Sequence, residues 1–275
     1  MPLITTPAGV VHIDEFGDGE PLLLLHANPG DPQDFDAVLP ELSARYHVIR
    51  VSWPGYGSGP APTPPQSASA MQFAELIVQL VSTLDLTNLR VIGNSVGGYA
   101  ATWLALCLPE RVRAIVLVST GGFTEHTRIS AAFCRFMGHE RVAHLLVRWL
   151  PFLYLRVKTA TVKAMRLRAA TIQREPVPVA VNAALWRSFT DPADDLRAAS
   201  RQLRVPALIM SGLHDPLVPV RDGRMAASCI PGAHHVILPC GHAAFAELPE
   251  VFLKLVLPFL AEPPTTVAPI TAGHE

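Results

Sequence analysis

Short apolar segments alternate with segments of helical spacing along much of the chain, and this alternation limits the possible folds more than any other feature. Several of the apolar runs are continuous, as expected for strands that are buried on both faces of a sheet. Between them, residues 70–84 and 96–108 carry helical spacing. The pattern predicts an α/β fold, with a mostly parallel central sheet flanked by helices. The predicted strands are 22–26, 47–52, 89–93, 114–119, 207–211 and 234–238, with 10–16 as an antiparallel edge strand.

The alternation stops after Gly122. Residues 123–199 are helical in pattern and hold 12 of the 22 Lys and Arg residues but only 6 of the 23 Asp and Glu residues. We expect this segment to be an inserted helical lid, with most of its arginines on solvated helix faces. The α/β core then comprises residues 1–122 and 200–262. Residues 263–275, rich in Pro and Thr, are predicted to form a disordered tail.

Charge and composition argue against several kinds of partner. The net charge is −1, and 49% of residues are hydrophobic, so there is ample core material and no global field for nucleic acid or an anionic membrane. The first residues lack the pattern of a secretory signal, and no apolar run is long enough to span a bilayer. We expect a cytoplasmic protein with reduced cysteines, because the four cysteines show no CxxC spacing. The sequence leaves the oligomeric state open.

The segment Gly93-Asn94-Ser95-Val96-Gly97-Gly98 follows a predicted strand and opens a predicted helix. A G-x-S-x-G nucleophile elbow requires this context. Its glycines remove the β-carbons that would clash where strand and helix approach each other. Ser95 is then exposed at a helix start, with the positive end and free N–H groups of the helix directed at its hydroxyl. A glycine-rich turn with an incidental serine is the alternative.

Two later residues complete a set that can activate Ser95. Asp215 follows the strand at 207–211, and His242 follows the strand at 234–238. A serine hydroxyl is a poor nucleophile until an imidazole takes its proton, and a carboxylate fixes the tautomer of that imidazole. Taken separately, Asp215 could cap a turn and His242 could pack in the core. Their order and their positions at strand ends favour a catalytic triad of Ser95, His242 and Asp215.

A fourth segment, His26-Ala27-Asn28-Pro29-Gly30, comes straight after the apolar strand residues 22–25 and resembles the His-Gly-x-Pro oxyanion loop of the α/β hydrolases. Together with the elbow and the triad order, it makes the chain resemble this superfamily over roughly residues 10–123 and 204–260. The resemblance implies an α/β-hydrolase fold. It also implies an oxyanion hole formed by the backbone N–H groups of Asn28 and Val96. His26 is expected to be structural and to bond loop backbone beneath the site.

The resemblance leaves the substrate class open. Asn28 resembles the halide-binding asparagine of haloalkane dehalogenases, but those enzymes need a carboxylate where Ser95 stands. The elbow and Cys240-Gly241-His242 resemble those of meta-cleavage C–C bond hydrolases, which usually carry Trp where Ala243 stands. A carboxylesterase or lactonase that acts on a small, largely apolar substrate is therefore expected. C–C bond hydrolysis, haloperoxidase or perhydrolase activity, and a non-catalytic small-molecule receptor are the alternatives.

No cofactor or metal is expected, because the sequence contains no HExxH motif, P-loop or dinucleotide fingerprint. A cleft that buries an organic substrate is mainly apolar, and residues 123–199 hold a large share of the aromatic residues. We therefore expect some of their side chains, together with residues beside the motifs, to contact the substrate. The residues expected in this role are Ala27, Phe123, Trp186, Val218 and Ala243.

Overall fold

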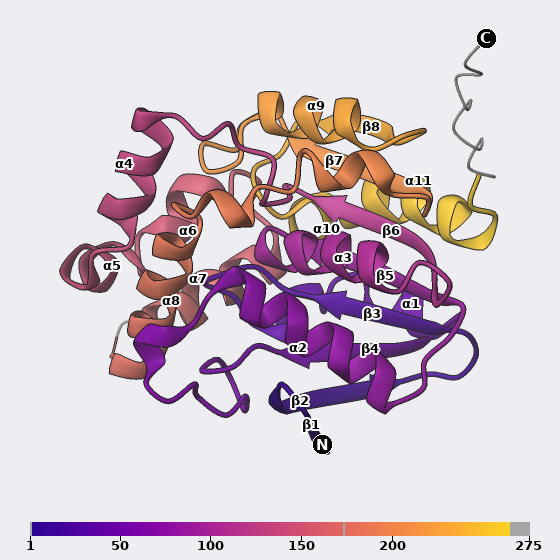
Figure 1. The fold of residues 1–275 in the computed structure, drawn as a ribbon, viewed down its shortest axis with the longest axis horizontal. Helices are drawn as coiled ribbons and strands as arrows, with labels where there is room; N and C mark the ends of the chain where they lie inside the picture. The colour runs from indigo at the N-terminus through magenta and orange to yellow at the C-terminus, as the bar shows by residue number, and fades with distance from the viewer. Residues whose placement is uncertain (1, 173, 265–275) are drawn as a thin grey trace, which may run out of the picture.

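The computed structural model describes residues 2–172 and 174–264 of the protein. Within these residues, one eight-stranded sheet has the order β1-β2-β4-β3-β5-β6-β7-β8 (Figure 1). Strands β3 to β8 pair in parallel, whereas β1 and β2 pair antiparallel. This mostly parallel sheet confirms the expected fold class. The strands are Leu3–Thr6 (β1), Gly9–Phe16 (β2), Pro21–Leu25 (β3), His47–Ser52 (β4), Leu89–Asn94 (β5), Val112–Val118 (β6), Ala207–Gly212 (β7) and His234–Leu238 (β8).

The antiparallel strand expected at 10–16 forms as β2, but its placement at the sheet edge is wrong. β1 covers its outer side, in a register that runs from Leu3↔His12 to Thr6↔Gly9. β1 has only four residues, and most of them are not buried. No apolar alternation therefore marks β1 in the sequence.

Side chains that alternate along the parallel strands divide the core into two apolar clusters, one for each face of the sheet. Leu23 and Val91 belong to the cluster that includes residues of α2, α3 and α9, which we call the first cluster. Leu24 and Ile92 belong to the second cluster, with residues of α1, α10 and α11. Helices therefore cover both faces. Their bounds are Leu39–Ser43 (α1), Ala70–Thr83 (α2), Val96–Cys107 (α3), Val220–Cys229 (α9), Ala244–Glu247 (α10) and Pro249–Ala261 (α11), with 3-10 helices at Pro32–Phe35 (η1) and Pro65–Ser67 (η2).

Between β6 and β7 the chain leaves the sheet and forms the helical insert, residues 123–199. Its helices lie together at one end of the sheet (Figure 1). Val181 of α8 is buried in the first cluster, whereas Leu155 and Val162 are buried in the second. The insert therefore contributes to the core on both faces of the sheet. Its helices are Arg128–Met137 (α4), Glu140–Leu146 (α5), Leu150–Tyr154 (α6), Ala160–Ile172 (α7) and Pro176–Ser188 (α8), followed by the 3-10 helices Pro192–Asp194 (η3) and Ala199–Gln202 (η4).

The predicted division into a core at 1–122 and 200–262 and a lid at 123–199 stays a prediction, since a lid is defined by movement. Most of the predicted tail, 263–275, lies outside the described residues. No helix in the described part of the chain is long and apolar enough to cross a bilayer.

Candidate active site

The elbow at Ser95 joins the end of β5 to the start of α3. Ser95 has φ 57° and ψ −114°, a backbone conformation that is strained for a residue with a side chain. Its N–H donates to the Val118 carbonyl and its carbonyl accepts from the Gly121 N–H, both at 3.0 Å. A β-carbon on Gly97 would lie 2.2 Å from the Leu25 carbonyl oxygen, so glycine allows α3 to pack this close to β3. These contacts hold Ser95, half-buried, at the carboxyl edge of the sheet.

Asp215 and His242 meet through a short hydrogen bond. Asp215 follows β7 and His242 follows β8, and these two strands are neighbours. Nδ1 of His242 lies 2.6 Å from Oδ2 of Asp215, with both side chains buried. Oδ1 of Asp215 accepts the backbone N–H groups of Leu217 and Val218 at 2.9 and 3.1 Å. The carboxylate is thus held by both oxygens, and Nε2 is the imidazole nitrogen left to exchange a proton.

The environment of Asp215 favours its charged form. Burial by itself would raise the pKa of this carboxyl, but the charge and hydrogen bond of His242 outweigh that effect, with help from the Val218 N–H. The pKa of Asp215 therefore lies below its ordinary value. An ionised Asp215 can fix the tautomer of His242 and stabilise the imidazolium that forms during catalysis.

Asn94 connects the elbow to the loop that carries His242. Its buried amide donates to the Val118 carbonyl at 2.9 Å and to the His242 carbonyl at 3.1 Å. Among the described residues, no hydrogen bond joins the Ser95 hydroxyl to His242, and such contacts are often long in substrate-free enzymes. The structure thus brings Asp215 and His242 into contact and places Ser95 at the same sheet edge. The triad role of the three stays a prediction.

The Asn28 loop follows β3, the strand that pairs directly with β5. Within the described part of the chain, the backbone N–H groups of Asn28 and Val96 have no acceptor. The Asn28 side chain is fixed instead, because its Oδ1 accepts from the Tyr56 hydroxyl and its Nδ2 donates to Oδ1 of Asn182 at 3.0 Å. Two unpaired N–H groups at the edge that carries Ser95 are what an oxyanion hole needs. Their joint role stays a prediction.

His26 supports the Asn28 loop from the inside. The Trp53 backbone N–H donates to Nε2 of His26 at 3.3 Å, so Nδ1 carries the proton that it donates to the Ala27 carbonyl at 2.8 Å. The Trp53 indole N–H donates to the His26 carbonyl at 2.7 Å. Burial lowers the pKa of His26 to about 4, so the ring is neutral at pH 7. With both ring nitrogens occupied, His26 is suited to hold the loop rather than to transfer protons.

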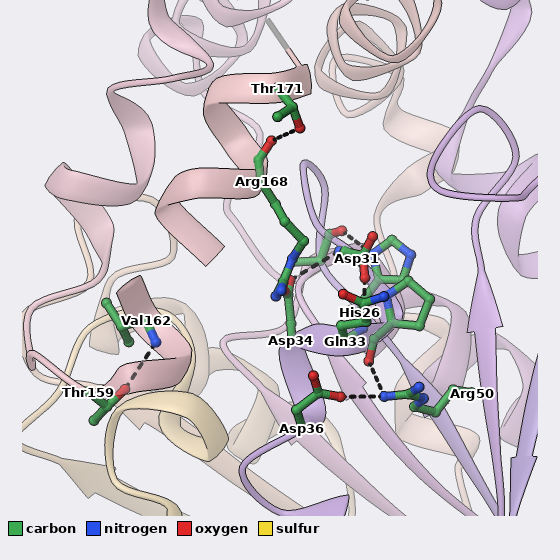
Figure 2. Close-up of polar contacts among 12 residues, drawn as sticks. His26, Asp31, Gln33, Asp34, Asp36, Arg50, Thr159, Val162, Arg168 and Thr171 are labelled. Atoms are coloured by element: carbon green, nitrogen blue, oxygen red, sulfur yellow. Dashed lines mark hydrogen bonds and ion pairs between the residues drawn. The ribbon is translucent and has the colours of Figure 1, made fainter. Parts of the chain in front are cut away.

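An ion pair ties this loop region to the helical insert. Asp34, in η1, accepts from the guanidinium of Arg168 on α7 at 2.6 Å (Figure 2). The other oxygen of Asp34 accepts the Asp31 N–H at 3.1 Å. Burial raises the pKa of Asp34 to about 6, although the nearby Arg168 charge and hydrogen bond partly offset it. The charge of this contact therefore changes close to physiological pH.

Four of the residues expected to contact substrate lie beside the motifs. Ala27 is buried in the Asn28 loop, and Val218 is half-buried, with its N–H on Asp215. Phe123 and Ala243 are fully buried, in the first and second clusters respectively, and both have packing roles there. Contact with substrate stays a prediction for all four.

The fifth, Trp186, is half-buried on α8. Its ring meets Phe133 of α4 edge to face, with ring centroids 5.6 Å apart. Asn182 stands one helical turn earlier on the same face of α8 and bonds Asn28. The Trp186 indole N–H and the Asn182 Nδ2 are buried and have no partner among the described residues. This face of α8 therefore offers two unused hydrogen-bond donors next to the Asn28 loop.

Sequence reasoning missed several polar residues of this region. Asn182 interrupts the apolar run at 179–185, and an isolated polar residue in such a run is a signal of a buried hydrogen bond. Asn94 lies inside the elbow motif itself. The pairing of Asp34 with Arg168 joins positions 134 residues apart, and no local pattern marks it.

The described residues include no group of three or more His, Cys, Asp or Glu side chains that is placed to hold a metal ion. Cys107, Cys134, Cys229 and Cys240 are all free thiols.

Comparison with known proteins identifies the fold family of the chain. A family model described as the alpha/beta hydrolase fold matches residues 20–249. The chain is 29% identical over 256 residues to the pimeloyl-[acyl-carrier protein] methyl ester esterase of Nitrosomonas europaea, and the alignment covers 89% of this chain and 97% of that protein. It is also 29% identical over 268 residues to a 2-hydroxy-6-oxononadienedioate/2-hydroxy-6-oxononatrienedioate hydrolase of Burkholderia vietnamiensis. That alignment covers 91% of this chain and 90% of the relative.

Solved structures show the same fold. The enol-lactonase from Burkholderia xenovorans superposes with a TM-score of 0.80 at 23% identity, covering 95% of this chain and all of that one. An esterase from Exiguobacterium antarcticum gives a TM-score of 0.81 at 20% identity, over 94% of this chain and 99% of that one. The family match spans most of the chain. The chain belongs to the α/β hydrolase fold family.

Proposed function

We propose that this protein is a serine hydrolase that cleaves a small, largely apolar carboxylic ester or lactone through an acyl-enzyme on Ser95. The observation that carries the proposal is the buried 2.6 Å hydrogen bond between Asp215 and His242 at the sheet edge that holds the strained Ser95. An acid–imidazole pair beside a serine elbow is suited to nucleophilic acyl transfer.

In the proposed reaction, Nε2 of His242 takes the proton of the Ser95 hydroxyl as its oxygen attacks the carbonyl carbon. The resulting oxyanion accepts from the backbone N–H groups of Asn28 and Val96, each worth about 3 kcal/mol of barrier lowering. His242 then gives the proton to the leaving alkoxide, and the acyl group stays on Ser95. A water that loses its proton to His242 then attacks the acyl carbon, the bond to the Ser95 oxygen breaks, and His242 returns the proton to that oxygen as the carboxylic acid leaves. In a lactone, the leaving alcohol remains part of the acyl group.

The Nitrosomonas relative supports acyl transfer, since it is a methyl ester esterase. The two unpaired donors on α8, from Asn182 and Trp186, favour a substrate with an acceptor oxygen away from the bond that is cleaved. A buried donor that meets such an oxygen on binding contributes to affinity and to selectivity, because the donor is otherwise left unsatisfied.

A second candidate is a C–C bond hydrolase of the meta-cleavage type. The Burkholderia vietnamiensis relative favours it, as do Gly93-Asn94-Ser95 and Cys240-Gly241-His242. In that reaction the bond broken joins the carbonyl carbon to a carbon leaving group. Parallel assays with nitrophenyl esters, lactones and a dienone ring-cleavage product decide between the two candidates.

The decisive variant is Ser95→Ala, assayed with its best substrate beside the exposed Ser228→Ala as control. We expect Ser95→Ala to lose activity by roughly a million-fold without unfolding, because triad members act as a unit. His242→Ala should match it, and Asp215→Asn should cost about ten-thousand-fold. A fluorophosphonate should label Ser95, as mass spectrometry of peptides would show. A folded Ser95→Ala that keeps roughly a tenth of the rate would refute the proposal.

A further inference from the structure

A buried carboxylate that the proposed chemistry does not use lies behind the histidine loop. Glu247, the last residue of α10, is 1% exposed. Its Oε2 accepts the backbone N–H groups of Arg156, Val157 and Gly241 at 2.6, 2.9 and 3.0 Å, and its Oε1 accepts that of Ala243 at 3.3 Å. All four partners are main-chain donors, an arrangement that suits the lone pairs of an ionised carboxylate.

These donors come from two segments that meet only in the folded protein. Gly241 and Ala243 flank His242, whereas Arg156 and Val157 follow α6 in the helical insert. Glu247 therefore joins the backbone on both sides of His242 to residues 154–157, which we call the insert brace.

The insert brace also contacts His242 directly. The His242 N–H donates to the Tyr154 carbonyl at 2.9 Å, and the Tyr154 ring meets the imidazole with centroids 5.3 Å apart. A β-carbon on Gly241 would lie 1.8 Å from the Tyr154 carbonyl oxygen, so only glycine permits this approach. Just after the insert brace, the Thr159 hydroxyl donates to the Ala246 carbonyl at 2.8 Å. The same hydroxyl accepts the Val162 N–H at the start of α7 (Figure 2).

Besides these contacts, the loop that carries His242 is held by the Asn94 amide, which donates to the His242 carbonyl at 3.1 Å, and by the His214 N–H, which donates to the Cys240 carbonyl at 2.9 Å. It lies outside the regular strands and helices, between β8 and α10, so its backbone groups depend on partners such as these. Removing the Glu247 carboxylate would leave four backbone N–H groups without their acceptor, and they would recover hydrogen bonds only by moving or by admitting water.

We propose that Glu247 is a positioning residue, which holds His242 against the insert brace so that Nδ1 stays aligned with Asp215 and Nε2 with Ser95. The inference rests on the proposed function, because it takes His242 as the general base. On this inference, residues 154–157 help to position the catalytic base, and we do not expect them to move away from His242 as part of a lid.

The test compares Glu247→Gln and Glu247→Ala with Glu250→Gln, an exposed glutamate three residues later in the first turn of α11. Glutamine keeps one acceptor oxygen, but in place of the other it carries an amide NH2, which would face a backbone N–H that now donates to Glu247. Since small displacements of a reacting group cost on the order of a hundredfold, we expect kcat to fall about ten- to a hundredfold, with KM within about twofold. Labelling of Ser95 by a small phosphonate should slow in parallel.

The spectroscopic readout is the low-field proton resonance of the Asp215–His242 hydrogen bond, recorded by NMR without substrate. We expect it to shift or broaden in Glu247→Gln at unchanged circular dichroism, and to stay in place in Glu250→Gln. Should Glu247→Ala fail to fold, the glutamine variant carries the test. A folded Glu247→Gln with normal kcat and an unmoved resonance would overturn the positioning role, as would a raised KM at normal kcat. The proposed function fails separately, if the unaltered protein shows neither turnover nor labelling of Ser95.

Discussion

Two buried aspartates near the candidate site, Asp215 and Asp34, have pKa values shifted in opposite directions. Burial raises the pKa of Asp215, but the charge and hydrogen bond of His242 together with the Val218 N–H lower it by more, so its pKa lies below the ordinary value. Burial raises the pKa of Asp34 by more than the charge and hydrogen bond of Arg168 lower it, so the pKa rises to about 6. Asp215 therefore keeps the charge that its proposed role needs, whereas Asp34 changes charge in a range where cells and assays operate.

The raised pKa of Asp34 makes a prediction for stability. The folded-state pKa of about 6 exceeds the ordinary 3.8, so the contribution of this group is fully present below pH 3.8 and is lost as pH rises through 6. Two pKa units correspond to about 3 kcal/mol. In urea unfolding, we expect the free energy of unfolding of the unaltered protein relative to Asp34→Asn to rise by up to about 3 kcal/mol as pH falls from 7 to 4.

The control for this measurement is Asp18→Asn, in an exposed turn. Its difference from the unaltered protein should stay flat over the same range. A flat difference for Asp34→Asn as well would mean that burial does not raise the pKa of Asp34 above its ordinary value against the opposing effect of Arg168, and the prediction would be wrong.

At the scale of elements, the helical insert is not uniform. α8 and the α6–α7 region are buried in the two core clusters, and the insert brace frames His242. α4 differs, because among its residues only Met137 is buried. Ile129 and Phe136 are 82% and 57% exposed. If part of the insert moves to admit substrate, α4 is the helix that its contacts hold least, because Ala143 of α5 is fully buried against Ala183 of α8.

The contact between Phe133 of α4 and Trp186 of α8 allows a matched test of substrate selection. We expect Trp186→Ala and Phe133→Ala to change the ratio of kcat/KM for long and short acyl esters on the order of tenfold, since apolar contacts in a pocket discriminate by this much. Phe136→Ala, on the same helix but more exposed than Phe133, at 57% against 40%, should leave the ratio unchanged. Phosphonate labelling of Ser95 should persist in all three variants. An unaltered acyl preference in both Trp186→Ala and Phe133→Ala would exclude this α4–α8 contact as the selector.

The elements show how far the sequence predicts this fold. β4 and β8 form at the predicted residues, and α2 and α3 end one residue before the predicted ends, because strong apolar patterns and clear stop signals mark them. The strand β1 is too short and too exposed to carry a pattern. The elbow and the residues after β7 and β8 were predictable because parallel strands bring their carboxyl ends to one edge. The role of Glu247 could not be predicted, since a single glutamate in the apolar run 243–248 does not reveal which backbone N–H groups it will accept.

At the scale of the whole molecule, the insert and the sheet share their apolar cores. The first cluster contains Val181 and Leu185 of α8 beside Trp53 and Phe73. The second contains Tyr154, Leu155, Val162 and Met165 of the insert beside Phe245 and Phe252. A segment buried in both clusters cannot unfold without exposing the apolar surface of the sheet. We therefore expect most of the insert to belong to the same cooperative unit as the sheet.

Native-state hydrogen exchange tests this expectation. Amides in the middle of α8, such as Val181, should exchange through the same global opening as those of β5, with opening free energies within about 1 kcal/mol of each other. Amides of α4 should exchange at clearly lower free energy, because that helix buries little and local openings expose few apolar contacts. Low denaturant should accelerate α8 and β5 together, since both would open with the full change in exposed surface. If α4 and α8 exchanged together and well before β5, the insert would be an independently opening lid, and the inference that movement is confined to α4 would be wrong.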